Sequence, residues 1–199
     1  KSIPWMSLTL ESMQEDFDVR KALLKTQDGQ MIETVLMMNA KEQWTVCLSS
    51  QIGCAMNCAF CATGKMGLKR NLTEDEIVDQ VRFWQSQIQL EERISNLVFM
   101  GMGEPMANYD SVKSALNTIL DNTDLGPVKI TVSTVGFLPR MDLMLDDPDW
   151  PEVRIAISLH SVDSIARKKL MPSSTPDFLN DLRDWCLRYL EKFGNNRHH

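Results

Sequence analysis

Three cysteines in the first half of the chain have a spacing that suits an iron–sulfur cluster. Cys54, Cys58 and Cys61 are three of the five cysteines and form the pattern C-x3-C-x2-C. A structural zinc site needs four protein ligands, and the nearest fourth sulfur, Cys47, lies seven residues earlier on a predicted strand. A disulfide scaffold normally needs an even set of cysteines in a small secreted chain. Three thiolates instead suit a [4Fe–4S] cluster in which one iron stays open for a substrate.

Four motifs in a fixed order carry a resemblance to a known family. The cysteine pattern, with Phe60 directly before its last cysteine, resembles the radical S-adenosylmethionine (SAM) superfamily. Together the motifs resemble the adenine-C2 RNA methyltransferases of the RlmN/Cfr type, over about residues 28–172. They are Cys47-Leu-Ser-Ser-Gln-Ile-Gly-Cys54, Gly101-Met-Gly-Glu-Pro-Met-Ala-Asn108, Ile130-Thr-Val-Ser-Thr-Val-Gly136 and Ala156-Ile-Ser-Leu-His160.

The resemblance implies which residues bind the cofactors. Glu104 would accept a hydrogen bond from the SAM ammonium group, and the glycines at 101 and 103 would let the backbone approach the ligand closely. Outside their motifs, Ser133 would be a strand hydroxyl bonded to backbone and His160 a structural histidine. The implied cluster ligands are Cys54, Cys58 and Cys61, and the implied SAM contacts are Gly103, Glu104, Ser133, Ser158, Leu159 and His160.

Two further residues receive catalytic roles from the resemblance alone. A glutamate in a matching Glu-Thr-Val context is a proton acceptor in the family, which implies that role for Glu33. Cys47 matches the cysteine that resolves the protein–RNA adduct by forming a disulfide. The alternatives are an exposed strand carboxylate for Glu33 and a buried core thiol for Cys47.

The implied activity is methylation of C2 of an adenosine in 23S rRNA, with tRNA as a further candidate substrate. One SAM would methylate a cysteine, and another would be cleaved reductively with an electron from a reductant such as flavodoxin or ferredoxin. No cysteine here matches the methyl-carrying one, and Cys186 is predicted to pack within the outer helices. We therefore interpret the chain as the catalytic-core portion of a longer protein, and we expect a monomer.

Other functions remain open on the sequence. The C8-methylating, antibiotic-resistance branch of the family shares the motifs, and product analysis would separate it from the C2 enzymes. A non-catalytic iron–sulfur or SAM-binding module without the reactive cysteine is the alternative from another class. A structural zinc protein is a third alternative, which metal analysis would decide.

Composition indicates one globular domain. The chain has 199 residues, of which 43% are hydrophobic, enough for a substantial core. No apolar run approaches a membrane span, and no signal peptide is visible, although the first residue is Lys1 rather than Met. These features, and thiols kept free for a cluster, predict a cytoplasmic protein with no membrane partner.

The charge gives little support to RNA binding. The net charge of −6 argues against a general nucleic-acid binder. Two basic groups flank the predicted site, and each is either a local binding surface or an ordinary solvated face. They are Lys65, Lys69 and Arg70 after the cysteines, and Arg167, Lys168 and Lys169 after His160.

Predicted strands and helices alternate along most of the chain. Asp28-Gly29 predicts a hairpin between Val19–Leu24 and Met31–Met38, and residues 1–16 are predicted to form a short helix. A capping box at Thr73–Glu76 starts a helix with apolar residues at helical spacing, namely Ile77, Val81, Trp84 and Ile88. The other expected strands are 44–50, 96–102, 128–135 and 153–160, and the other expected helices are 109–120, 138–145 and 177–193. The apolar run 96–102 indicates a parallel strand covered on both faces.

This alternation predicts an α/β fold of right-handed parallel βαβ units. Four such units make most of the (β/α)6 partial barrel that the resemblance implies. We expect residues 1–43 to form an N-terminal extension with the hairpin, and residues 44–199 to form a radical-SAM partial barrel that is incomplete at its C-terminus. Functional groups in such barrels collect at the carboxyl ends of the strands, so all four motifs are expected at one edge.

Overall fold

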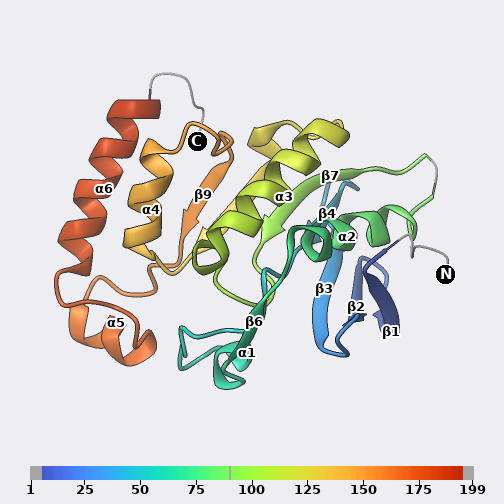
Figure 1. Ribbon diagram of the computed structural model, residues 1–199, viewed down its shortest axis with the longest axis horizontal. Coiled ribbons are helices and arrows are strands. Elements are labelled where there is room, and N and C mark those ends of the chain that lie inside the picture. The colour runs from blue at the N-terminus through green and yellow to red at the C-terminus, as the bar shows by residue number, and fades with distance from the viewer. Residues whose placement is uncertain (1–5, 90, 195–199) are drawn as a thin grey trace.

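One mixed sheet of seven strands organises the protein (Figure 1). The structure is a computed structural model that describes residues 6–89 and 91–194. Strands β1 to β4 pair antiparallel, whereas β4, β7, β8 and β9 run parallel to one another. In sheet order the strands are β1 (Leu8–Glu15), β2 (Val19–Thr26), β3 (Met31–Met38), β4 (Trp44–Cys47), β7 (Ile94–Phe99), β8 (Ile130–Thr134) and β9 (Arg154–Ile157).

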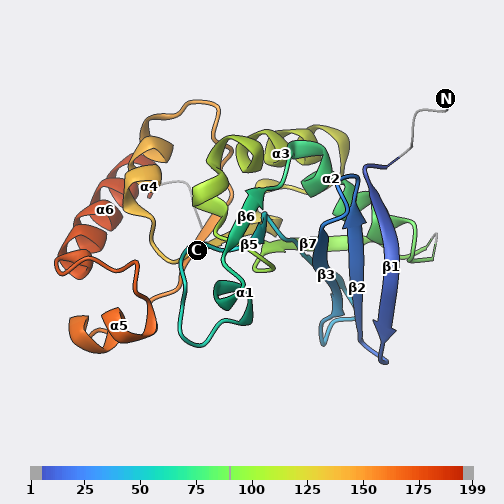
Figure 2. The same ribbon diagram turned by 60° about the horizontal axis from the view of Figure 1, so that its bottom comes forward.

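Helices α2 and α3 lie on the same side of the sheet (Figure 2). The main chain also forms short 3-10 turns at Pro105–Asn108 (η1) and Pro127–Lys129 (η2). None of the described helices has the length and apolarity needed to cross a membrane. The helices are α1 (Ala62–Lys65), α2 (Glu74–Gln85), α3 (Tyr109–Asn122), α4 (Leu138–Asp146), α5 (Ser164–Leu170) and α6 (Phe178–Phe193).

The core lies between the sheet and these helices. Successive strand residues point to opposite faces, and Val46, Leu97 and Val132 are fully buried on one of them. Val98, on the other face, is only half-buried. The expectation that β7 is covered on both faces is therefore wrong for the part of the chain that the structure describes.

The N-terminal segment is a strand rather than the predicted helix. β1 pairs antiparallel with β2, with a register irregularity between Leu10 and Ser12. Pairing along a preformed hairpin edge outweighs the weak helical preference of this short mixed segment. Residues 1–5 lie outside the described residues. The predicted hairpin of β2 and β3 is confirmed. Because β3 also pairs with β4, the hairpin and the parallel strands form one continuous sheet.

Two local elements were not predicted. The strand expected over 44–50 ends at Cys47, and a small hairpin of β5 (Gln51–Gly53) and β6 (Leu68–Asn71) then encloses the cysteine loop and α1. Helix α5 follows the last motif, where the sequence analysis placed only a basic group. The alternation of parallel strands and helices is otherwise as expected, with each predicted element overlapping an observed one.

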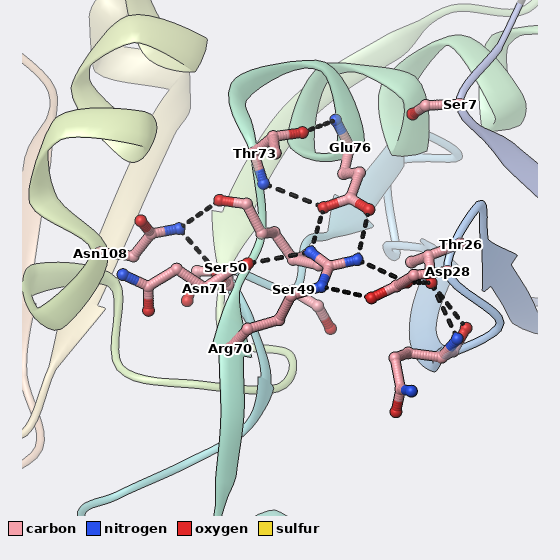
Figure 3. A network of polar contacts seen from close by, with 12 residues as sticks. Ser7, Thr26, Asp28, Ser49, Ser50, Arg70, Asn71, Thr73, Glu76 and Asn108 are labelled. Atoms are coloured by element: carbon pink, nitrogen blue, oxygen red, sulfur yellow. Dashed lines mark hydrogen bonds and ion pairs between the residues drawn. The ribbon is translucent and has the colours of Figure 1, made fainter.

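Arg70 joins the hairpin turn, β6 and the start of α2 (Figure 3). Its guanidinium donates to both carboxylate oxygens of Asp28, at 2.8 Å each, and to both of Glu76, at 2.7 and 2.8 Å. Glu76 also accepts the Thr73 amide, while the Thr73 hydroxyl accepts the Glu76 amide, which confirms the capping box. Bidentate pairs of this kind fix geometry, so the network sets where the hairpin lies relative to β6.

Asp28→Asn is expected to lower the Tm at neutral pH and to have less effect in acid. Arg70 and the Thr26 hydroxyl lower the pKa of Asp28 in the folded chain. A carboxyl group whose pKa falls on folding stabilises the protein above its unfolded pKa, and that contribution is lost as the pH falls toward the folded pKa. The Tm difference from wild type should be full above about pH 5 and shrink below about pH 4.

The matched control for this measurement is Asp18→Asn, because Asp18 is an exposed carboxylate at the other end of β2. Thermal unfolding of all three chains between about pH 3 and pH 7 decides the prediction. An Asp28→Asn effect of equal size at both ends of the range would mean that the Asp28 charge does not act through Arg70.

Candidate cluster and cofactor site

The carboxyl ends of the parallel strands enclose a cavity of about 300 Å³. All four sequence motifs contribute to it, as the rule for parallel strands predicts. Its lining residues come from the cysteine loop, the segment after β7, the end of β8 and the segment after β9, together with Met171 after α5. They are Cys54, Met56, Cys58, Phe60, Cys61, Phe99, Met100, Gly101, Gly103, Glu104, Ser133, Thr134, Val135, Ser158, His160 and Met171.

The three motif cysteines share this cavity as free thiols. Cys54 and Cys58 are buried, whereas Cys61 is half-buried at the N-terminus of α1. The loop is held by main-chain bonds from Cys54 to Gly67 at 3.1 Å and from Cys61 to Cys58 at 3.1 Å. Burial raises the pKa of the Cys54 and Cys58 thiols, and the neighbouring cysteines raise it further. A bound metal ion would favour the thiolate form of these groups.

The donor set fits a cluster in type and position. Three sulfur ligands in an apolar surrounding, with Phe60 and Met56 beside them, match what a [4Fe–4S] cluster uses. Within residues 6–89 and 91–194, no three His, Cys, Asp or Glu side chains are arranged around a single metal ion. A cubane cluster makes a different demand, since each thiolate binds its own iron.

Glu104 is a buried carboxylate, 2% exposed, at the base of the segment after β7. One oxygen accepts the Met106 amide at 3.0 Å, and the other accepts the Val135 amide at 2.8 Å. Burial raises the pKa of Glu104, and the Thr134 hydroxyl and these two amides act in the opposite direction. Each oxygen has a second lone pair, so the carboxylate can accept from a cationic ligand without releasing its main-chain partners.

Gly101 and Gly103 are required because neighbouring protein atoms leave no room for a side chain, whether or not a ligand also approaches them. A Cβ on Gly101 would lie 2.7 Å from the Leu48 carbonyl oxygen, and one on Gly103 would lie 2.6 Å from the Gln51 Cβ. Gly103 also has a φ of +103°, which side chains rarely adopt. The Gln51 amide oxygen accepts the Glu104 amide at 2.8 Å. The absence of side chains thus lets the segment after β7 lie directly on the strand that leads to the cysteines.

The last two motifs place two hydroxyl groups and one ring at the cavity. Ser133 and Ser158 have their hydroxyl oxygens 3.5 Å apart. His160 has a φ of +58° and its ring centroid lies 4.4 Å from that of Phe60. Leu159 is not among the lining residues, and its carbonyl instead accepts from Arg167 at 3.2 Å. The structure therefore brings five of the six predicted SAM contacts to the cavity.

The two residues with predicted catalytic roles do not line the cavity. Glu33 lies on β3 with its side chain 48% exposed and pairs with Lys21 at 2.9 Å. Cys47 is buried at the end of β4, where its carbonyl accepts the Thr34 hydroxyl, and burial raises the pKa of its thiol. Their roles stay predictions. Cys186 lies on α6 and packs against the core, as predicted.

Most of the basic residues near the site are engaged by protein. Arg70 belongs to the network with Asp28, and Lys69 donates to Gln30 at 2.9 Å. Arg167 is 1% exposed, so its interpretation as a solvated or RNA-binding residue is wrong. Lys168 donates to the carbonyls of Pro172 and Ser174. The sequence analysis did not predict that Met171 lines the cavity. The only sequence signal for it is its position shortly after Arg167, Lys168 and Lys169.

A family model described as the radical SAM superfamily matches residues 48–190. The chain belongs to that superfamily. Membership implies SAM and an iron–sulfur cluster, and the matched range contains every residue that lines the cavity. The partial barrel of the radical SAM fold agrees with the mixed sheet described above.

Named relatives of this radical SAM chain are RNA methyltransferases. It is 45% identical over 175 residues to a probable dual-specificity RNA methyltransferase RlmN from Aquifex aeolicus, covering 86% of this chain and 49% of the relative. It is 44% identical over 185 residues to the dual-specificity RNA methyltransferase RlmN 1 from Myxococcus xanthus, covering 92% and 51%. The chain spans about half the length of these curated relatives.

A solved structure resembles the whole described fold. The crystal structure of a radical SAM methyltransferase from Sphaerobacter thermophilus superposes with a TM-score of 0.85 at 37% sequence identity. The match covers 96% of this chain and 57% of that one. Both halves of the sheet, the antiparallel extension and the parallel strands, therefore belong to the shared architecture.

Proposed function

We propose that this chain is the cluster- and SAM-binding core of an RNA methyltransferase that modifies C2 of an adenosine in 23S rRNA, with tRNA as a second substrate. The observation that carries the proposal is one cavity lined by three free cysteines, the Glu104 carboxylate and the Ser133 and Ser158 hydroxyls. The relatives' names, dual-specificity RNA methyltransferase, support the substrate class. An RNA substrate and reduced thiols also support a cytoplasmic location.

The residues divide the task by their chemistry. Cys54, Cys58 and Cys61 would hold a [4Fe–4S] cluster, which together with SAM supplies one-electron reductive cleavage chemistry. Glu104 would accept a hydrogen bond from the ammonium group of SAM, since it is the one carboxylate among the lining residues. Ser133 and Ser158 would donate to the polar parts of the same ligand. Met56, Phe60 and Met100 would keep water from the site.

The roles of the other two residues are part of the same proposal. Cys47 would resolve the protein–RNA adduct, and burial raises the pKa of its thiol. Glu33 would accept a proton from the RNA base. Its side chain is 48% exposed, so an RNA substrate could reach it once its ion pair with Lys21 opens.

The direct test is anaerobic reconstitution of this chain with iron and sulfide, followed by reduction and addition of SAM. Formation of 5′-deoxyadenosine supports the cluster- and SAM-binding core, and its absence from a chain with a full cluster overturns it. The methyl transfer needs the methyl-carrying cysteine, which no residue of this chain matches. It is therefore tested on a full-length protein that contains these residues, by incubation with a 23S rRNA fragment and with tRNA and mass spectrometry of the nucleosides. 2-Methyladenosine supports the proposal, and 8-methyladenosine would assign the chain to the C8 branch.

A further inference from the structure

Arg167 is a buried cation whose described partners are all neutral. It lies on α5, is 1% exposed, and its guanidinium carbon lies 3.4 Å from the centroid of the Phe178 ring. It donates to the carbonyls of Leu159 at 3.2 Å and Val135 at 2.7 Å, and to the Ser174 hydroxyl. Among the residues that the structure describes, no carboxylate forms an ion pair with it.

The two carbonyls that Arg167 holds belong to different walls of the cavity. Val135 directly follows β8, and its amide donates to Glu104, so one residue connects the guanidinium to the buried carboxylate. Leu159 lies between Ser158 and His160, which both line the cavity. One rigid planar group thus fixes the end of β8 relative to the segment after β9.

Helix α5 also contacts the third wall of the cavity. The Leu170 carbonyl accepts the Ala59 amide of the cysteine loop at 2.8 Å, and Met171 is buried among the lining residues. Phe178 packs on the other side of the guanidinium and directly against Gly136, where a Cβ would lie 2.5 Å from the ring. Arg167 therefore contacts two walls directly, and its helix α5 also contacts the third.

A purely structural role explains this arrangement poorly. Burying a cation among neutral groups is costly, and an apolar residue of similar length would fill the same space beside Phe178. Burial lowers the pKa of Arg167, and the charge of a Cys58 thiolate opposes that effect. The negative charge of a Cys58 thiolate that binds the cluster would offset part of this cost, which connects Arg167 to the loaded site.

We propose that Arg167 is a positioning residue for the SAM site. Its planar fork holds the Val135 and Leu159 carbonyls in one arrangement and so sets where the Glu104 carboxylate and the Ser158–His160 segment meet the ligand. The proposal rests on the proposed function, because it assigns the cavity to SAM. Arg167 itself contacts main chain and does not act as a catalytic residue.

Two substitutions at position 167 distinguish the role of the planar guanidinium from that of the positive charge. Arg167→Lys keeps a positive charge but offers a single flexible nitrogen, and Arg167→Met keeps the stem and removes the charge. Arg20→Lys is the matched control, because Arg20 also lies over an aromatic ring, that of Trp44 at 5.3 Å, and donates to a carbonyl, that of Gln87 at 2.9 Å. Arg20 is not among the residues that line the cavity.

The first measurement is amide hydrogen exchange on the 199-residue chain without cofactors. We expect the Val135 and Ser161 amides, bonded to Glu104 and Leu159, to exchange faster in both Arg167 variants, while strands β2 and β3 keep wild-type protection. The Arg20 control should leave Val135 and Ser161 unchanged. Wild-type protection of these two amides in Arg167→Lys would overturn the proposal.

The second measurement is the SAM dissociation constant of the cluster-loaded chain at matched iron and sulfide content. We expect it to rise roughly 10- to 100-fold in both Arg167 variants and to stay unchanged in Arg20→Lys, whatever the loss in Tm. Equal SAM affinity in wild type and Arg167→Lys overturns the positioning role alone. Failure of the loaded wild-type chain to bind SAM overturns the proposed function instead.

Discussion

Cys58→Ala is expected to give a folded chain that assembles no intact [4Fe–4S] cluster and forms no 5′-deoxyadenosine. Cys58 is the middle ligand of the predicted set and is only 6% exposed. With its sulfur removed, Cys54 and Cys61 leave two irons without protein ligands, too few to hold a cubane. The loss of SAM cleavage should exceed the roughly 100-fold that changes around a metal site typically cost.

Cys186→Ala is the matched control for this substitution. This substitution also removes one cysteine sulfur, but from a half-buried position on α6. There the Cys186 side chain packs against the core and lies outside the cavity. We expect wild-type iron and acid-labile sulfide per chain in Cys186→Ala and wild-type 5′-deoxyadenosine formation. Thermal unfolding of the apo chains verifies that Cys58→Ala keeps its fold, since one buried thiol removed costs only about 1 kcal/mol.

A parallel Cys47→Ala chain makes the ligand assignment falsifiable. Cys47 is buried at the end of β4 and is absent from the cavity lining, so its removal should leave the cluster content unchanged. If Cys58→Ala instead kept full iron and sulfide while Cys47→Ala lost both, the cluster ligands would include Cys47 and the C-x3-C-x2-C assignment would be wrong.

The parts of the fold that were predictable are those with local or repeating signals. The capping box at Thr73 determines where α2 starts, because both of its hydrogen bonds lie within three residues. The shared position of the four motifs follows from topology alone, since parallel strands all end at the same edge of the sheet. Neither inference requires knowledge of long-range contacts.

The parts that were not predictable depend on partners far away in the sequence. Helical and extended conformations compete in the segment that forms β1, and the β2 edge decides between them. In the sequence, the neighbouring Lys168 and Lys169 make Arg167 resemble part of a solvated basic group. Its burial depends instead on a distant partner, the Val135 carbonyl 32 residues earlier. The absence of Glu33 from the cavity lining likewise depends on how the hairpin joins β4, which no local motif encodes.

Glu104→Gln is expected to destabilise the chain by about 1–3 kcal/mol and to weaken SAM binding. Both carboxylate oxygens accept main-chain amides, from Met106 and from Val135. Main-chain amides can only donate. A glutamine presents one oxygen and one NH2 group, so one buried amide would face another donor and lose its hydrogen bond. Urea unfolding of the apo chain measures the first effect, and calorimetric SAM titration of the loaded chain measures the second.

Glu74→Gln provides a control with the same chemical change. The Glu74 carboxylate accepts from the Ser114 and Thr118 hydroxyls, at 2.5 Å each, where α2 meets α3. Hydroxyls can rotate to accept as well as donate, so the glutamine at 74 can be accommodated with a smaller loss of stability and no change in SAM affinity. Equal losses of stability in the two variants would show that the Glu104 main-chain bonds carry no special cost. Wild-type SAM affinity in Glu104→Gln would remove this carboxylate from the ligand site, because the lost negative charge would then have had no cationic partner.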